Sequence, residues 1–197
     1  MMHDSGLEPG KDDYENHGSQ ADWAEMSQRA YELGRAYERE FRGCGQCTLA
    51  AILDALGLFN EDVFEAATPF AGGLGHCGDA TCGALIGASL AIGLVSPRRR
   101  ANFGGDRESK YRSFAMVEQL VERHRQRFGG ITCHDVHRRL FGRAYDLRSE
   151  AEREAFDAAG AHEDKCTSVV AQVAQWAVEI IAAERMKGVS EQSAEAE

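Results

Sequence analysis

The stretch CGALIGASLAIGLV, residues 82–95, is apolar throughout, and half of its residues are glycine, alanine or serine. A helix that is apolar on every side is a buried one, and small side chains let its neighbours approach closely. Gly83, Gly87 and Ala91 recur every four residues and so form a single stripe without large side chains. We therefore expect a central, buried helix here. We also expect a second helix to lie along the stripe and to bring its cysteine up to Cys82.

The chain on both sides of this stretch also has helical periodicity. Apolar residues from Trp23 to Phe41 recur at steps of three and four, with Asp22 and Glu25 at the expected start and Gly43 at the expected end. Further helices are expected over residues 45–56, 61–70, 109–127, 132–140, 149–159 and 163–186. Strand-like alternation is missing from the sequence. The prediction is an all-α fold, a single helical-bundle domain over residues 22–187 with disordered tails at residues 1–21 and 188–197.

Composition narrows the class of protein. The net charge of −10 argues against nucleic acid as a partner, and the basic surplus between Arg98 and Arg148 is interpreted as a solvated helix face. The longest apolar run, residues 83–95, is too short to span a bilayer, and no secretory signal begins the sequence. We therefore expect a cytoplasmic protein without a membrane partner. Six cysteines in a reducing compartment are expected to be metal ligands or redox groups rather than disulfides.

The cysteines share one position relative to the predicted helices. Cys44 and Cys47 open the helix over residues 45–56, Cys82 opens the central helix, and Cys133 and Cys166 each fall in the first turn of a later helix. Free N–H groups and the helix dipole favour thiolate at such positions, so the sequence predicts lowered thiol pKa values. Thiolates that converge from separate helix starts would suit a metal centre. The sixth cysteine, Cys77, lies in the glycine-rich loop AGGLGHCGDAT.

The residues alone leave three chemistries open. Covalent haem attachment is excluded, because Thr48 rather than histidine follows the Cys44-x-x-Cys47 pair. That pair could instead act as a thiol–disulfide oxidoreductase, or could join Cys77 and Cys82 in a structural zinc site. A third alternative is a metal cluster held by cysteines of separate segments. His76, His134 and His162 lie close to cysteines in the sequence and are interpreted as polar neighbours of the site or surface residues, with ligation left open.

With these segments in view, the chain resembles the C_GCAxxG_C_C family of redox-active proteins from about Gly43 to Val173. CGQCTLAAILDALGL resembles the opening helix of that family, with Cys44 in the first cysteine position. FAGGLGHCGDATCGALIGASLAIGL resembles its glycine loop and Cys-Gly-Ala-x-x-Gly helix, carrying Cys82. FGGITCHDV and KCTSVVAQVAQW resemble the last two segments, with Cys133 and Cys166. Cys47 and Cys77 fall outside this quartet as accessory candidates.

The family is similar to the iron–sulfur portion of split-Soret cytochromes c, which implies a helical fold and a cluster on four cysteines. The resemblance thus implies an iron–sulfur protein, with a [2Fe–2S] cluster on Cys44, Cys82, Cys133 and Cys166, that transfers electrons or senses redox state. Its expected partner is another redox protein of unknown identity, with a homodimer left open and its role as an oxidoreductase component undecided. The thiol–disulfide oxidoreductase using Cys44 and Cys47 and the zinc-stabilised module remain the alternatives.

Overall fold

The computed structural model describes the backbone of residues 19–195 and the side chains of residues 19–187; residues 1–18 and 196–197, which belong to the expected tails, lie outside it. As predicted, the described chain is all-α, and within it no strand forms beyond one isolated bridge between Thr81 and Thr132. The helices are α1 (Gln20–Glu40), α2 (Cys44–Ala55), α3 (Glu61–Ala66), α4 (Gly83–Val95), α5 (Arg107–Phe128), α6 (Cys133–Phe141), α7 (Glu150–Ala158) and α8 (Cys166–Glu195). A 3₁₀ turn, η2 (Arg100–Asn102), precedes α5, and a π-helical turn, η3 (Ala161–Lys165), leads directly into α8.

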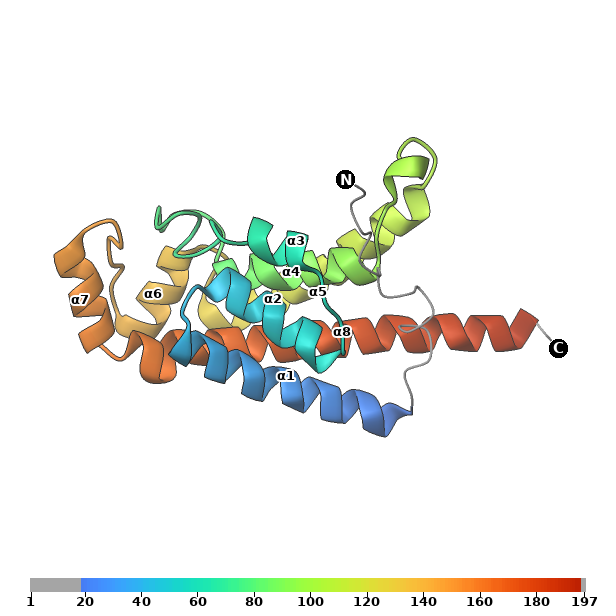
Figure 1. The fold of residues 1–197 in the computed structure, drawn as a ribbon, viewed down its shortest axis with the longest axis horizontal. Coiled ribbons are helices and arrows are strands. Elements are labelled where there is room, and N and C mark those ends of the chain that lie inside the picture. The colour runs from blue at the N-terminus through green and yellow to red at the C-terminus, as the bar shows by residue number, and fades with distance from the viewer. Residues whose placement is uncertain (1–18, 196–197) are drawn as a thin grey trace, which may run out of the picture.

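The longest helix, α8, forms the base of the bundle. Helix α1 lies along it, α2, α4 and α5 pack over it, and α6 and α7 gather at the end where α8 begins (Figure 1). Gly34 of α1 faces the backbone of Val170 and Ala171 so closely that an added Cβ would lie 3.2 Å from it. This small residue lets α1 and α8, which run antiparallel, pack in direct backbone contact.

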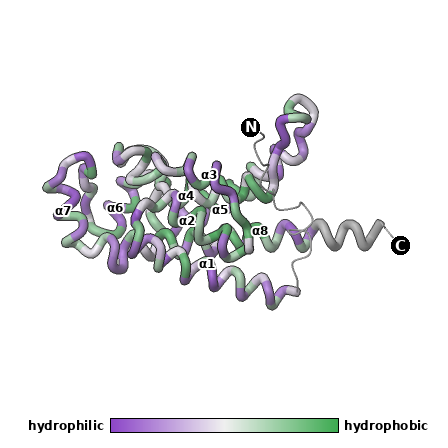
Figure 2. The backbone as a smooth tube through the Cα atoms, viewed as in Figure 1, coloured by the Kyte–Doolittle hydropathy of each residue, from purple (hydrophilic) through white to green (hydrophobic). Residues whose placement is uncertain are grey.

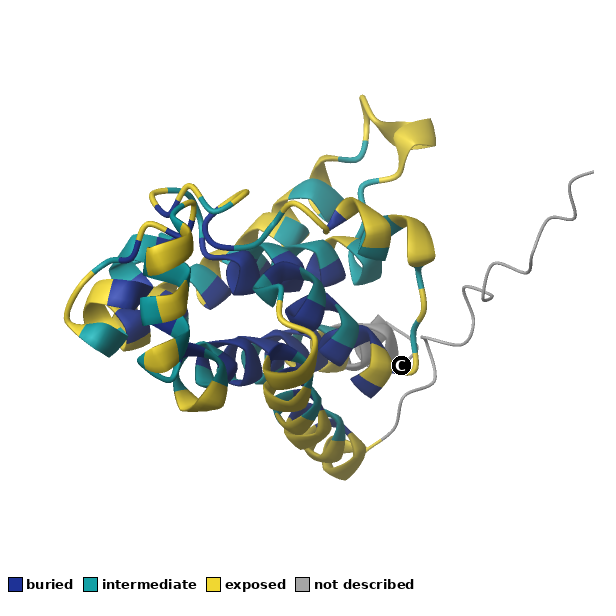
Figure 3. Cartoon of the chain, turned by 60° about the vertical axis from the view of Figure 1, so that its left-hand side comes forward, coloured by how far each residue is buried: buried dark blue, intermediate teal, exposed yellow. Residues whose placement is uncertain are grey.

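Helix α4 is buried in the interior, as its composition predicts. It contacts α2, α5 and α8, and its buried residues are Gly83, Ala84, Leu85, Gly87, Ala88, Ala91 and Ile92. The hydropathy trace shows apolar residues concentrated along α2, α4 and the inner part of α8, with polar residues outside (Figure 2). Burial follows the same pattern (Figure 3). Burying this apolar area supplies the main driving force for the fold, at roughly 25 cal/mol per Å².

A second, smaller apolar cluster lies beside the main core. It consists of Tyr145, Leu147, Phe156 and Ala161, with Phe141 and Cys166 packed against it. Because it joins α6, α7 and the π turn, it forms a separate apolar wall facing the starts of α2 and α4.

One described segment, Ala161–Lys187, is long and apolar enough in composition to cross a membrane. However, 61% of its most apolar window is buried inside the protein. Val169, Val170 and Val173 are among its fully buried side chains. The apolar character of α8 is therefore accounted for by its place in the core.

Helix boundaries differ from the predicted ones where local chemistry decides them. Asp22 and Glu25 were expected to mark the start of α1, but the helix begins at Gln20. The Ser19 N–H donates to the Asp22 carboxylate at 2.7 Å and stabilises this start. Helix α3 ends at Ala66 instead of Phe70, because Pro69 has no N–H to continue the helix and disfavours a helical conformation at Thr68. The expected C-terminal tail over residues 188–197 has a helical backbone as far as Glu195.

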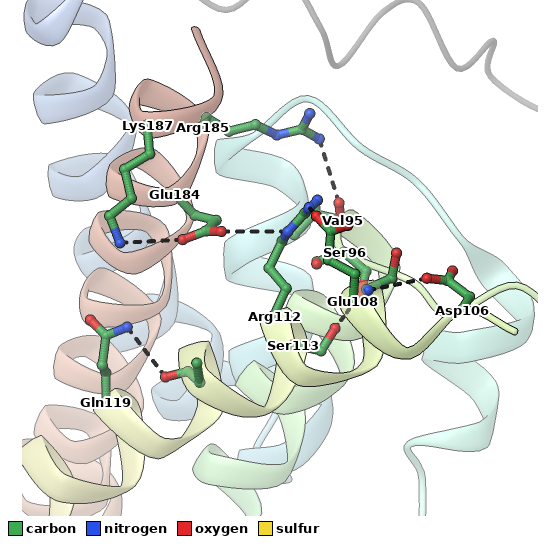
Figure 4. Close-up of polar contacts among 12 residues, drawn as sticks. Val95, Ser96, Asp106, Glu108, Arg112, Ser113, Gln119, Glu184, Arg185 and Lys187 are labelled. Atoms are coloured by element: carbon green, nitrogen blue, oxygen red, sulfur yellow. Dashed lines mark hydrogen bonds and ion pairs between the residues drawn. The ribbon is translucent and has the colours of Figure 1, made fainter. Parts of the chain in front are cut away.

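The corner between α4 and α5 is tied to α8 by polar contacts (Figure 4). Arg112 pairs with Glu184 of α8 at 3.6 Å, and Arg185 donates to the Val95 carbonyl at 3.5 Å. Ser113 donates to the Ser96 carbonyl, so the start of α5 is also held against the end of α4. These contacts fix the end of the bundle that lies away from α6 and α7.

Candidate metal centre

Backbone pairing brings Cys82 and Cys133 together. Their segments meet at the bridge between Thr81 and Thr132, where the Cys82 N–H donates to the Ile131 carbonyl at 2.8 Å and the Cys133 N–H donates to the Ala80 carbonyl at 3.0 Å. Each cysteine then starts a helix, Cys82 as the cap of α4 and Cys133 as the first residue of α6. Two helix starts that are far apart in the sequence are thereby held side by side.

The stripe of small residues on α4 places Cys44, as the sequence analysis expected. A Cβ on Gly83 would collide with the Cys44 sulfur, and a Cβ on Gly87 would collide with the Gly45 carbonyl. Helix α2 can lie this close only because these positions carry no side chain. The start of α2, with Cys44, therefore sits directly on the start of α4.

Cys166 enters the site from a π-helical turn. Its N–H donates to the Ala161 carbonyl, five residues back, so its amide is already paired. Cys166 is the first residue of α8, in agreement with its predicted place in a first turn, but the preceding π turn already pairs its amide, so the expected free N–H is not present at this residue. Single π turns inside helices occur often at functional sites.

The four predicted ligands line one cavity of about 490 Å³ between the main core and the smaller apolar cluster. Cys44, Cys82, Cys133 and Cys166 all contribute to its wall. Three of these cysteines come from α2, the α4 cap and α6, and the fourth comes from α8. The structure thus brings together the quartet that the resemblance implied.

The two accessory cysteines lie outside this cavity wall. Cys47 is buried one turn further along α2, where its thiol donates to the Arg42 carbonyl at 3.1 Å. Cys77 is exposed in the glycine loop. The zinc arrangement that pairs Cys44 and Cys47 with Cys77 and Cys82 is therefore not assembled around this cavity.

Burial, rather than helix starts, controls the thiol pKa values. It raises the pKa of Cys82 to about 11, although N–H groups of Ala84 and Leu85 act in the opposite direction. Burial, followed by the negative charge of Glu38, raises the pKa of Cys44 and of Cys166 well above the ordinary value. The pKa of Cys133 is also raised, first by burial and then by the charge of Cys82. The prediction of lowered values was wrong, because desolvation outweighs the helix dipole here.

The pair Cys44 and Cys47 is poorly suited to thiol exchange. Burial and the nearby Glu38 raise the pKa of the Cys47 thiol, as they do for Cys44. The thiolate is the reactive form, so a buried pair with raised pKa values would react slowly. The raised pKa values argue against thiol–disulfide exchange at this pair.

Several hydrogen-bond donors nevertheless point at the sulfurs. The Gly72 N–H of the glycine loop acts on Cys44, and the Ala84 and Leu85 N–H groups act on Cys82. Gly73 in the same loop has φ +68 and lies so close to Cys133 that an added Cβ would be 2.8 Å from the Cys133 Cβ. The loop therefore needs glycine both for its backbone conformation and for its approach to the site.

His137 contacts the site, although it is not among the candidate residues predicted from the sequence. Its Nε2 lies 3.3 Å from the Cys133 sulfur, while its Nδ1 accepts from the Tyr145 N–H at 3.4 Å. Since Nδ1 is an acceptor, Nε2 carries the proton and donates to the sulfur. Burial lowers the pKa of His137 to about 4, which keeps the ring neutral near pH 7. Its spacing of four residues from Cys133 on a helix is the signal that could have revealed it.

Of the histidines singled out in the sequence, two line the cavity. His76 does so from the glycine loop, with φ +66, and His162 does so from the π turn. His134 instead packs against Gly78, where an added Cβ would overlap its imidazole ring. It therefore serves to hold the glycine loop against α6.

Glu38 is the other residue that the sequence did not reveal. It lies on α1, is 2% exposed, and lines the same cavity. Among the described residues, its Oε2 has no hydrogen-bond partner. A buried carboxylate beside buried thiols is costly unless a positive charge or a proton compensates it.

The chain belongs to the family described as "Putative redox-active protein (C_GCAxxG_C_C)", whose pattern matches residues 42–180. No curated protein and no solved structure shows significant similarity to the chain. The matched region contains all six cysteines and begins at the residue whose carbonyl accepts the Cys47 thiol. The family assignment supports a redox role for this protein.

The donor set of the cavity fits a cluster centre. Four thiols that are neutral when buried can be held as thiolates by bound metal, which releases their protons. Within the side chains that the structure describes, no group of three or more Cys, His, Asp or Glu residues lies close enough together to hold a metal ion as it stands. The four thiols instead border a cavity shared by several elements.

Proposed function

We propose that this protein is an iron–sulfur redox protein, with Cys44, Cys82, Cys133 and Cys166 as the cluster ligands. The observation that carries the proposal is that four cysteines from separate segments line one buried cavity. Four cysteines are the usual ligand set of [2Fe–2S] and [4Fe–4S] clusters, and we propose the two-iron form. Such a cluster would supply one-electron transfer.

The chain's own residues would set the properties of that site. Gly72, Ala84 and Leu85 direct N–H groups at Cys44 and Cys82, and His137 donates to Cys133. Hydrogen bonds to cluster sulfurs raise the reduction potential, because they stabilise the more negative reduced state. The apolar walls formed by Val169, Phe156 and their neighbours would limit access of water.

The biological setting that we propose follows from this activity. The protein would exchange electrons with a protein donor or acceptor in the cytoplasm, without a nucleic-acid or membrane partner. Electron transfer and redox sensing are both compatible with the site. Self-association as a homodimer remains a prediction.

The test is metal analysis with a visible absorption spectrum on protein purified without oxygen. The proposal expects iron and acid-labile sulfide together with visible charge-transfer bands. Zinc alone would favour the structural module, and metal-free protein with titratable thiols would favour the thiol–disulfide alternative. Either of those results would overturn the proposal.

A further inference from the structure

A chain of acidic and imidazole groups leads from the cavity toward the surface. Oε1 of Glu38 lies 3.6 Å from Nδ1 of His162, and Nε2 of His162 lies 3.4 Å from Oδ1 of Asp157. The side chains of Glu38, His162 and Asp157 are 3%, 19% and 40% exposed, in that order. The three groups therefore form a graded path from the enclosed site to solvent.

The two ends of this path differ in their hydrogen-bond and ion-pair partners. At the surface, the other Asp157 oxygen, Oδ2, pairs with Nη1 of Arg42 at 2.9 Å. At the inner end, Oε2 of Glu38 and Nδ1 of His162 have no hydrogen-bond partner among the described residues. The Cys47 thiol of α2 also interacts with the Glu38 carboxylate, so Oε2 is the oxygen of this buried group that remains open.

The charge of Glu38 acts electrostatically on the sulfurs of the four cavity cysteines. It contributes to raising the pKa of Cys44, Cys82, Cys133 and Cys166. Coupling between two sites is reciprocal, so negative charge added at the sulfur centre acts on the Glu38 carboxylate as Glu38 acts on the sulfurs. Enclosure strengthens this coupling, because the Glu38 side chain is only 3% exposed and bulk solvent screens it little.

The other charged groups at the cavity are less enclosed. Helix α7 contributes Glu150, Arg153, Glu154 and Asp157, all of which are exposed or half-buried. Arg42, His76 and His137 line the cavity from the chain before α2, from the glycine loop and from α6. Arg42 is committed to Asp157, and His137 is committed to Cys133 and Tyr145.

The π turn holds His162 beside Glu38. His162 is held in η3, and Nη2 of Arg39 on α1 donates to the Glu163 carbonyl of the same turn at 2.8 Å. This contact ties the turn to the helix that carries Glu38. The distances on both sides of His162 are slightly longer than formed hydrogen bonds, so proton transfer requires a small rotation of the imidazole.

We propose that the site couples electron uptake to proton uptake, with Glu38 as the proton acceptor and His162 as the carrier from Asp157. This inference rests on the proposed function. One electron from a one-electron donor enters the centre, and one proton from solvent passes through Asp157 and His162 to the Glu38 carboxylate. The charge of the electron is thereby balanced by the charge of the proton in the enclosed site, and on reoxidation the electron passes to a one-electron acceptor while the proton returns through His162 and Asp157 to solvent.

The first experiment measures the reduction potential of the metal-loaded protein as a function of pH by mediated redox titration. The wild type should show a potential that falls with rising pH, by about 59 mV per unit over the responsive range, the value for a tenfold change at one electron. Glu38→Gln should remove this dependence. Glu154→Gln, which removes an exposed carboxylate from the same cavity, is the matched control and should keep it.

The second experiment is redox-difference infrared spectroscopy, which detects the proton directly. On reduction, the wild type should gain a carboxylic acid C=O band that Glu38→Gln lacks. His162→Gln should keep the pH dependence of the potential but slow proton uptake at least tenfold, and added imidazole should restore the rate. A pH-independent wild-type potential, or a carboxylic acid band that survives in Glu38→Gln, would overturn the relay while leaving the cluster proposal intact. Protein without iron and sulfide would overturn both.

Discussion

The sulfur of Cys44 occupies the space that a side chain at Gly83 would fill. Gly83 is the first residue of α4 and directly follows Cys82, so this contact places two of the four cysteines of the cavity next to each other. The contact continues along the two helices, because Gly87 faces the Gly45 carbonyl in the same way. The same contacts therefore pack α2 on α4 and place Cys44 next to Cys82.

Replacing Gly87 should damage both packing and the site. A Cβ in Gly87→Ala would meet backbone atoms of Gly45 and Leu49, which cannot move aside as a flexible side chain could. We expect a loss of roughly 1–3 kcal/mol in the free energy of unfolding, with reduced iron content, measured by denaturant titration and metal analysis. Gly93→Ala on the same helix is the control, since nothing lies within 4 Å of its added Cβ, and it should gain up to about 1 kcal/mol. Equal stability of the two variants would contradict close packing at Gly87.

Serine replacements should divide the six cysteines into two groups. Cys82→Ser and Cys133→Ser should remove most of the iron, because both side chains line the cavity. Cys47→Ser and Cys77→Ser should keep most of it, because neither does. Iron analysis of each purified variant makes the comparison. A similar loss in all four variants would show that the division between ligands and accessory cysteines is mistaken.

His137→Phe should lower the reduction potential while preserving the fold. The ring packs against Phe141, Tyr145 and Phe156, so phenylalanine retains the aromatic contacts but removes the donor to Cys133. A net hydrogen bond of about 1 kcal/mol corresponds to a shift of roughly 40 mV for a one-electron couple. Redox titration measures the shift, and circular dichroism checks the fold. An unchanged or higher potential in a folded variant would rule out this role for the imidazole.

The stability of the metal-free protein should depend on His124 as the pH falls. Burial lowers the pKa of His124, whose Nδ1–H donates to the Gly130 carbonyl at 2.8 Å. The unfolded chain therefore binds this proton more readily than the folded chain does, so the stabilising contribution is complete above about pH 6.5 and is lost as the pH falls below it. The slope should approach about 1.4 kcal/mol per pH unit.

The comparison is between wild type and His124→Gln, with urea unfolding at several pH values between 7.5 and 5 on reduced protein. The variant should be less stable near pH 7 but should lack this part of the slope. Parallel curves for the two proteins would mean that His124 does not contribute to acid sensitivity.

Periodicity was enough to predict the helices because each has a clear apolar pattern or a clear boundary residue. The small-residue stripe of α4 even predicted which kind of contact would position a cysteine. The same reasoning failed at Phe70 and at the start of α8, where Pro69 and a π turn shift the boundary. A π turn has no distinct periodic signal, because it adds a single residue to one helical turn.

The site was harder to predict than the fold. The order of the cysteine segments indicated the quartet, but the short pairing of Thr81 with Thr132, which joins two of them, is too brief to give a strand pattern. Glu38 resembles any polar residue of an amphipathic helix until the fold encloses it. The thiol pKa values depend on desolvation, which no local pattern reports, so helix position alone gave the wrong direction for Cys82.

The most direct test of the cluster proposal is X-ray absorption at the iron edge on protein purified without oxygen. We expect iron surrounded by sulfur, with a short iron–iron neighbour, and chemical analysis of the same sample should give two iron and two sulfide per chain, as in a [2Fe–2S] cluster. The same measurement on Cys82→Ser should lose this signal together with the metal. Iron bound mainly by nitrogen or oxygen, or a wild-type protein without iron, would contradict the central claim that Cys44, Cys82, Cys133 and Cys166 hold an iron–sulfur centre.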